Sequence, residues 1–61
     1  MKKYRAFLLT AEGQVIQAID LVCASEDDAI TRAEQLLQPD GECPVELWDG
    51  PRLVARFEPG Q

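Results

Sequence analysis

The sequence predicts a small α+β protein with the element order ββαββ, built as a four-stranded antiparallel sheet with one helix packed on one face. Two pairs of strand-like segments, each joined by a short Gly-containing turn, flank one amphipathic helical segment. A chain of 61 residues is expected to form a single domain, here residues 1–61. With 46% hydrophobic and 28% charged residues, its composition is typical of a folded globule.

The first two strands are expected at residues 3–10 and 15–23. Both segments are rich in aliphatic and aromatic residues, which favour strands. The four residues between them include Gly13, which adopts a positive φ at little cost. A short loop of this kind predicts an antiparallel hairpin.

A helix is expected to follow Ser25 and to end near Gln38. Ser25 is a good N-cap, and three acidic residues follow it at the positive end of the helix dipole. The apolar positions form one stripe at helical spacing: Ala29, Ile30, Ala33, Leu36 and Leu37. Pro39 and Gly41 are typical of the residues that terminate a helix.

The second hairpin is expected from strands at residues 44–48 and 53–57. The turn between them is the cluster Asp49-Gly50-Pro51-Arg52. If the helix runs back along the second strand, the third strand is either its parallel neighbour or is separated from it by the first strand. We prefer the second arrangement, with strand order 2-1-3-4, because an antiparallel sheet tolerates one solvated face.

The alternation of side chains along each strand assigns residues to the two faces of the sheet. The face under the helix is expected to hold Tyr4, Ala6, Leu8, Ile19, Leu21, Cys23, Val45, Leu47, Leu53, Ala55 and Phe57. The opposite face is expected to hold Arg5, Phe7, Leu9, Ile16, Ala18, Val22, Trp48, Val54 and Arg56. A β-bulge would exchange some of these positions.

The face opposite the helix is too apolar to be simply solvated, which makes it the candidate interface. Large exposed apolar patches usually mark interaction sites. We therefore expect a homodimer, with Arg5 and Arg56 framing an apolar contact formed by Phe7, Leu9, Ile16, Trp48 and Val54. For Trp48 the alternative is a partly buried position in the core of the protein.

Enzyme activity is not expected, because the sequence lacks the residues that common mechanisms require. There is no histidine, which is the commonest general base and metal ligand. Cys23 and Cys43 are the only cysteines, so a zinc site within one chain is not expected, and neither is any other cofactor. The acidic run Glu26-Asp27-Asp28 could hold a cation but is better explained by helix capping.

The net charge of −5 argues against nucleic acid as the partner, although Lys2, Lys3, Arg5, Arg52 and Arg56 lie on or near the strands. The apolar segment after Arg5 is too short for a signal sequence, and no segment is long enough to span a membrane. We therefore expect a cytoplasmic protein with two unbridged thiols and no membrane partner.

Three segments carry a resemblance to a known group: 4–8 (YRAFL), 20–30 (DLVCASEDDAI) and 45–56 (VELWDGPRLVAR). Together they resemble a group of very short bacterial proteins, common in alphaproteobacteria, to which no activity is assigned. The resemblance covers most of the chain. It implies a bacterial cytoplasmic protein and supplies no catalytic or binding residues.

A looser resemblance is to HicB-type antitoxins, in which two strands, a segment like Asp20-Leu21-Val22-Cys23 and an acidic capped helix follow one another in this order. The glycines of that family around the Cys, and its DNA-binding tail, are missing here. Two hypotheses follow. The first is a non-enzymatic interaction module that forms a homodimer, and the second is an acidic antitoxin-like protein that neutralises a basic protein partner.

Overall fold

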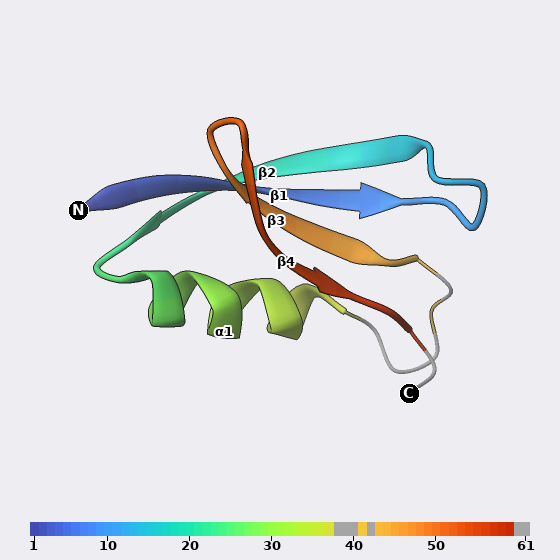
Figure 1. The fold of residues 1–61 in the computed structure, drawn as a ribbon. Helices are drawn as coiled ribbons and strands as arrows, with labels where there is room; N and C mark the ends of the chain where they lie inside the picture. Colours follow the sequence, from blue (N-terminus) through green and yellow to red (C-terminus); the bar gives the residue numbers. More distant parts are fainter. Residues whose placement is uncertain (38–40, 42, 60–61) are drawn as a thin grey trace.

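The structure is a computed structural model that describes residues 1–37, 41 and 43–59. Its elements are β1 (Lys2–Leu9), β2 (Val15–Cys23), α1 (Glu26–Leu36), β3 (Val45–Asp49) and β4 (Arg52–Phe57). All neighbouring strands are antiparallel, in the order β2-β1-β3-β4. Figure 1 shows α1 on one side of this sheet. The predicted ββαββ fold and the preferred strand order are therefore confirmed.

The two hairpins turn at the glycines that the sequence indicates. Gly13 has a φ of 88° and Gly50 has a φ of 61°, a region that residues with a Cβ adopt only with strain. In the first turn the Thr10 N–H donates to the Gln14 carbonyl oxygen at 2.8 Å. The Thr10 hydroxyl also accepts from the backbone N–H groups of Glu12 and Gln14, which fixes the loop between β1 and β2.

Helix α1 begins at the predicted cap and ends slightly before the predicted position. The Ser25 hydroxyl accepts from the Asp28 N–H at 3.2 Å, which satisfies one free donor of the first turn. The Asp28 side chain does not complete a capping box, since it pairs with Arg32 at 3.4 Å. Leu37 is extended, with a ψ of 120°, and closes the helix by donating to Glu34. The predicted end at Gln38 lies outside the described residues.

The core lies between α1 and the sheet. Tyr4 and Ala6 from β1, Val45 and Leu47 from β3, and Cys23 at the end of β2 are all almost completely buried there. The helix contributes the predicted stripe, with Ala29 and Ala33 fully buried and Ile30, Leu36 and Leu37 packed against the same cluster. The two alanines allow the helix backbone to approach the sheet closely, because their side chains are short.

Two β-bulges change the predicted faces. Between Leu47 and Trp48 the register of β3 and β4 shifts, so that Trp48 pairs with Leu53. As a result Leu53 is 45% exposed, whereas Val54 packs against the core. The prediction that Leu53 is buried and Val54 lies on the opposite face is therefore wrong. A second shift between Leu8 and Leu9 leaves Ile16 as the extra residue of β2.

Candidate interaction surface

The sheet face opposite α1, called the open face below, is the predicted interface. Two rows of cross-strand neighbours organise it. In the first row, Asp20 of β2 lies beside Arg5 of β1, which lies beside Trp48 of β3. In the second row the neighbours, from β2 to β4, are Ala18, Phe7, Glu46 and Arg56. The strand register therefore places two aromatic side chains and two pairs of opposite charges on one surface.

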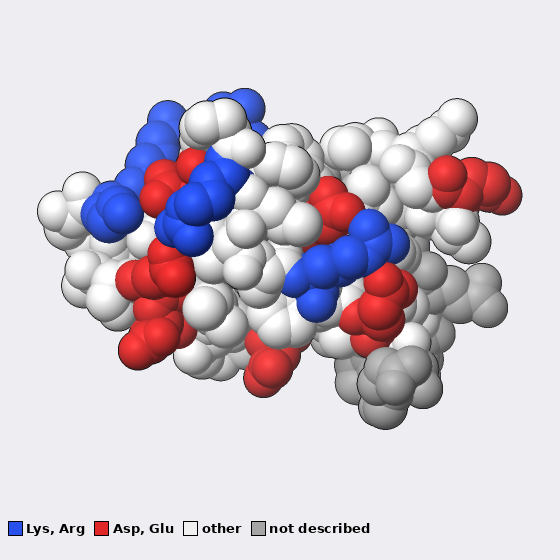
Figure 2. Space-filling view, in the orientation of Figure 1, with Lys and Arg blue, Asp and Glu red and all other residues white. Residues whose placement is uncertain are grey.

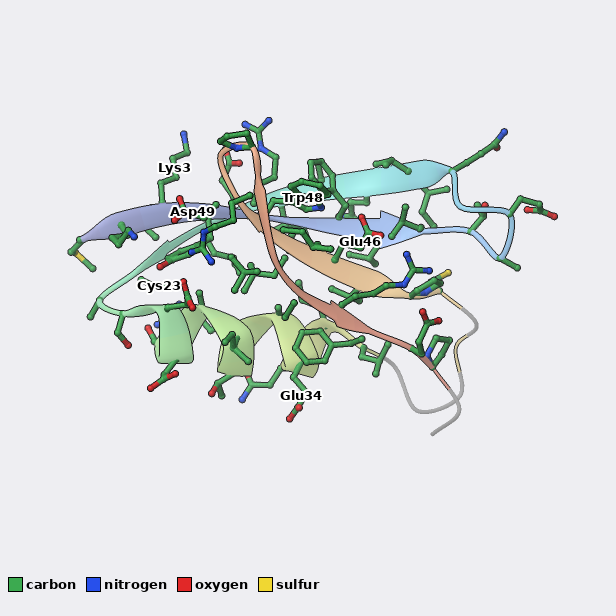
Figure 3. All side chains as sticks on the ribbon, in the orientation of Figure 1. Lys3, Cys23, Glu34, Glu46, Trp48 and Asp49 are labelled. Atoms are coloured by element: carbon green, nitrogen blue, oxygen red, sulfur yellow. The ribbon has the colours of Figure 1, made fainter. Side chains whose placement is uncertain are left out.

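Trp48 is held in place by Glu46, two residues earlier on the same strand. The Trp48 Nε1–H donates to Glu46 Oε1 at 3.1 Å, and the Arg56 Nη1–H donates to Glu46 Oε2 at 2.6 Å. Figure 3 shows Trp48 and Glu46 near each other on the sheet, away from the helix residue Glu34. Each Glu46 carboxylate oxygen thus has a donor, and the half-buried indole ring has a fixed orientation.

Asp20 organises the other end of the open face. The Arg5 Nε–H donates to Asp20 Oδ1 at 3.0 Å, and the Lys3 ammonium lies 3.7 Å from Asp20 Oδ2. The hydrogen bond from Arg5, together with the positive charge of Lys3, lowers the pKa of the Asp20 carboxyl. These contacts therefore favour the ionised form of the Asp20 carboxyl. Its charge is compensated within the chain.

A shallow hollow of about 330 Å³ lies on the open face among Arg5, Phe7, Asp20 and Trp48. This volume is at the low end of the range of about 300–1,000 Å³ for small-molecule pockets, which are mostly apolar. Here the charged groups of Arg5 and Asp20 are already paired with each other. The charged groups that line the hollow are therefore not free to form ion pairs with a small molecule.

The predicted interface residues are only partly brought together. Phe7 and Trp48 are half-buried neighbours on the open face, and Arg56 lies on the edge strand β4, as a rim residue would. Arg5 lies on the central strand β1 and not at the rim. Leu9 is only 5% exposed, Ile16 is 56% exposed at the β2 bulge, and Val54 packs toward the core. The exposed apolar area at the centre of the face is thus smaller than the sequence indicates.

A second group of charges joins the helix to the sheet. Arg52 at the start of β4 donates to Glu26 of α1 at 2.6 Å and lies 3.4 Å from Asp49, which also pairs with Lys2. The hydrogen bond from Lys2 lowers the pKa of Asp49. Glu26 in the first turn of the helix is thus paired with Arg52 of the second hairpin.

Every Lys and Arg side chain of the chain forms a salt bridge with a carboxylate. Figure 2 shows basic side chains lying beside acidic ones across the visible surface. A surface that binds a phosphate backbone needs cations that are free to replace the counterions of the nucleic acid. The arrangement therefore gives no support to nucleic-acid binding by these basic side chains.

The cysteines, the possible metal ligands and the helix of the described part of the chain bear on other kinds of site. Cys23 is buried, Cys43 is half-buried, and both are free thiols. Residues 1–37, 41 and 43–59 contain no group of three or more His, Cys, Asp or Glu side chains placed to hold a metal ion. Over the same residues, no helix combines the length and the apolar character that crossing a membrane requires.

Comparison with known proteins returns no relative: no family model, no curated protein and no solved structure is significantly similar to the chain. The fold and the surface geometry are thus the basis for any statement about function. Both resemblances described above remain expectations.

Sequence reasoning overlooked Glu46 and Asp20, the two acids that orient the open face. Both were available from the pattern of alternation. Glu46 is two residues from Trp48, and Asp20 is two residues from Ala18, so alternation places both acids on the open face. The pairing of Asp20 with Arg5 depends on the bulge, because Leu9 pairs with Val15 beside the loop whereas Arg5 pairs with Asp20.

Proposed function

We propose that the chain is a non-enzymatic interaction module that forms a homodimer by packing the open faces of two sheets against each other. The observation that carries this proposal is the position of Trp48. It lies at the centre of a sheet face that no described element of the chain covers, and its ring is oriented by Glu46. Oriented aromatic side chains are typical anchors of protein interfaces.

The charge pattern of the open face fits a second copy of the same face. Aligned sheets pack with their strands within about 30° of each other. A two-fold axis parallel to the strands, between β1 and β3, sets β1 of each copy over β3 of the other. Arg5 of one copy then lies against Trp48 of the other, which is a cation–π contact made twice.

The size of the domain gives a reason for association. A chain of about 60 residues buries only about 60% of the surface that it exposes when unfolded, so its stability alone is small. Only one face of the sheet packs against the helix. Covering the half-buried Phe7 and Trp48 with a second copy would add apolar burial without a larger chain.

Sedimentation equilibrium at micromolar concentration tests the homodimer. Trp48→Asp removes the anchor and places a carboxylate beside Glu46, so we expect the mass of the assembly to fall by half. Gln35→Asp adds the same charge on the exposed side of the helix and is expected to leave the mass unchanged. Should Trp48→Asp fail to fold by circular dichroism, the exposed Arg5→Gln replaces it and is expected to weaken the dimer. A wild-type chain that stays monomeric, or an Arg5→Gln dimer as tight as wild type, contradicts the proposal.

The second candidate is an acidic neutraliser of a basic protein, in the manner of an antitoxin. It is favoured by carboxylates that have no cation: Glu12, Asp27 and Glu34 form no salt bridge with any described Lys or Arg. Asp27 and Glu34 are exposed and are seven residues apart on α1, so they lie on the same side of the helix.

A pull-down at low and high salt separates the two candidates. A single basic partner that is released at high salt, and also by the double variant Asp27→Asn/Glu34→Gln, supports the neutraliser. Glu12→Gln at the first hairpin turn is the matched control. Loss of the partner with Glu12→Gln as well, or retention with the helix variant, would exclude a helix-based neutraliser.

A further inference from the structure

The two edges of the sheet differ in how they are protected. Edge strands expose unpaired backbone groups, and natural proteins usually guard them with charges, proline or bulges. Strand β4 follows Pro51, carries Arg52 and Arg56, and contains a bulge within its six residues. Strand β2 is nine residues long and carries a single charged residue, Asp20, with no proline or lysine. Its bulge lies at one end, so most of the edge is regular.

The outward backbone groups of β2 follow from the hydrogen bonds at the end of β1. The Leu9 N–H donates to Pro44, toward β3, whereas the Thr10 N–H donates to Gln14, toward β2. Since backbone groups alternate sides along a strand, even-numbered residues of β1 are the ones bonded to β2. Their neighbours on β2 are odd-numbered. The N–H and C=O groups of Ala18, Asp20 and Val22 therefore point outward, where no described residue bonds to them.

The exposed apolar side chains of the protein gather on this same strand. Val15, Ile16 and Val22 are 53–56% exposed, and they are three of the five large apolar residues exposed in the described part of the chain. Figure 1 shows β2 bordering the sheet, with no other element beyond it. The edge thus combines unpaired backbone donors and acceptors with unburied apolar surface.

We propose that β2 pairs in antiparallel fashion with β2 of a second copy, about a two-fold axis at Ile19, and joins two sheets into one. This register opposes Ala18 to Asp20 of the other copy, so outward backbone groups meet outward backbone groups. It also sets Ile16 of each copy beside Val22 of the other, which covers the exposed apolar side chains.

Neighbouring registers are worse for identifiable reasons. An axis at Asp20 places the two Asp20 carboxylates directly opposite each other, which is destabilising. An axis at Leu21 leaves Ile16 outside the paired segment. With the axis at Ile19 the two carboxylates are only diagonal neighbours, and each is already compensated by Arg5 and Lys3 of its own chain.

Taken alone, this two-fold contact pairs the β2 edges of two copies and stops at two chains. It uses the backbone edge of β2, whereas the open-face contact is centred on the side chain of Trp48 on β3. When both contacts form, each chain contacts two different copies, one through the β2 edge and one through the open face.

Amide hydrogen exchange by nuclear magnetic resonance tests the edge contact on the wild-type protein. The outward amides of Ala18, Asp20 and Val22 should exchange on the order of tenfold or more slowly at high than at low concentration. The amides of Ile19 and Leu21 serve as internal controls, since they are bonded to β1 at every concentration. Fast exchange of the three outward amides at all concentrations, with Ile19 and Leu21 protected, would overturn the proposal. This result would leave the open-face dimer untouched.

Variants separate the two contacts by mass. Val22→Lys places a charge on the edge, and Ala18→Pro removes an outward N–H without removing a bond to β1. In sedimentation equilibrium each edge variant should leave only the dimer formed through the open face, and its combination with Trp48→Asp should give monomer. Gln35→Lys on the helix is the control. If the folded edge variants keep the wild-type mass, the edge contact is wrong. If only Trp48→Asp keeps it, the open-face contact is wrong.

Discussion

The two faces of the sheet are made from the same strands but are stabilised by different interactions. On the helix side, Tyr4, Ala6 and Leu47 are buried to about 1% exposure or less, and apolar packing dominates. On the open face, their immediate neighbours Arg5 and Trp48 lie among ion pairs and hydrogen bonds. Successive residues of one strand therefore point alternately into the apolar core and toward the polar open face.

This difference indicates where the stability of the domain resides. Burial of apolar area stabilises by about 25 cal/mol per Å², whereas an exposed ion pair contributes about 0–1 kcal/mol. The salt bridge of the open face between Arg5 and Asp20 joins two side chains that are about half exposed, and in the pair of Arg56 with Glu46 the arginine is 45% exposed. They orient the side chains of the open face and add little to stability.

The largest contrast between the faces is expected from two leucines. Leu47→Ala empties a fully buried position and should lower the free energy of unfolding by about 2–5 kcal/mol. Leu53→Ala removes the same atoms from an exposed position and should change it by less than about 0.5 kcal/mol. Both are measured by urea denaturation at the same low protein concentration. Equal losses at the two positions would mean that the open face is packed in the free chain.

A smaller effect is expected at the cap of the helix that covers one face. Ser25→Ala removes the acceptor of the Asp28 N–H and should cost about 0.5–2 kcal/mol. Ser25→Asp retains an acceptor at the cap and should restore most of the loss. Thermal unfolding followed by circular dichroism measures both. A Ser25→Ala variant as stable as wild type would show that the first turn of α1 does not depend on its cap.

An effect of opposite sign is expected at Tyr4. Its hydroxyl is buried without a hydrogen-bond partner among the described residues, and an unsatisfied buried group costs about 1–3 kcal/mol. Tyr4→Phe keeps the ring and removes the hydroxyl, so the variant should be at least as stable as wild type in urea denaturation. A loss greater than about 1 kcal/mol would show that the hydroxyl has a partner in solution.

The sequence predicts the fold well because each signal is local. Ser25, the apolar stripe of α1, and Gly13 and Gly50 in the turns each act within a few residues, and the structure confirms all of them. Strand order followed from the need to cover only one face of the sheet. The faces of β4 were partly wrong, because a bulge depends on how two strands fit together and leaves no mark in the alternation of one strand.

The candidate surface was less predictable than the fold for a related reason. The apolar side chains of Trp48 and Phe7 and the alternation along their strands predict that both lie on the open face. The roles of Asp20 and Glu46 depend on their cross-strand neighbours. The exposure of β2 depends on which strands are at the edges of the sheet, and so it follows only after the strand order is known. The structure therefore adds what the sequence does not show: which residues are cross-strand neighbours and which strands lie at the edges of the sheet.

Tryptophan fluorescence during dilution tests most directly whether a second copy covers the open face. Trp48 is the only tryptophan of the chain, so the signal reports on that face alone. The account predicts that dilution from micromolar to nanomolar concentration shifts the emission to longer wavelength and increases quenching by acrylamide. An emission and a quenching constant that do not change over this range would contradict a homodimer formed through the open face.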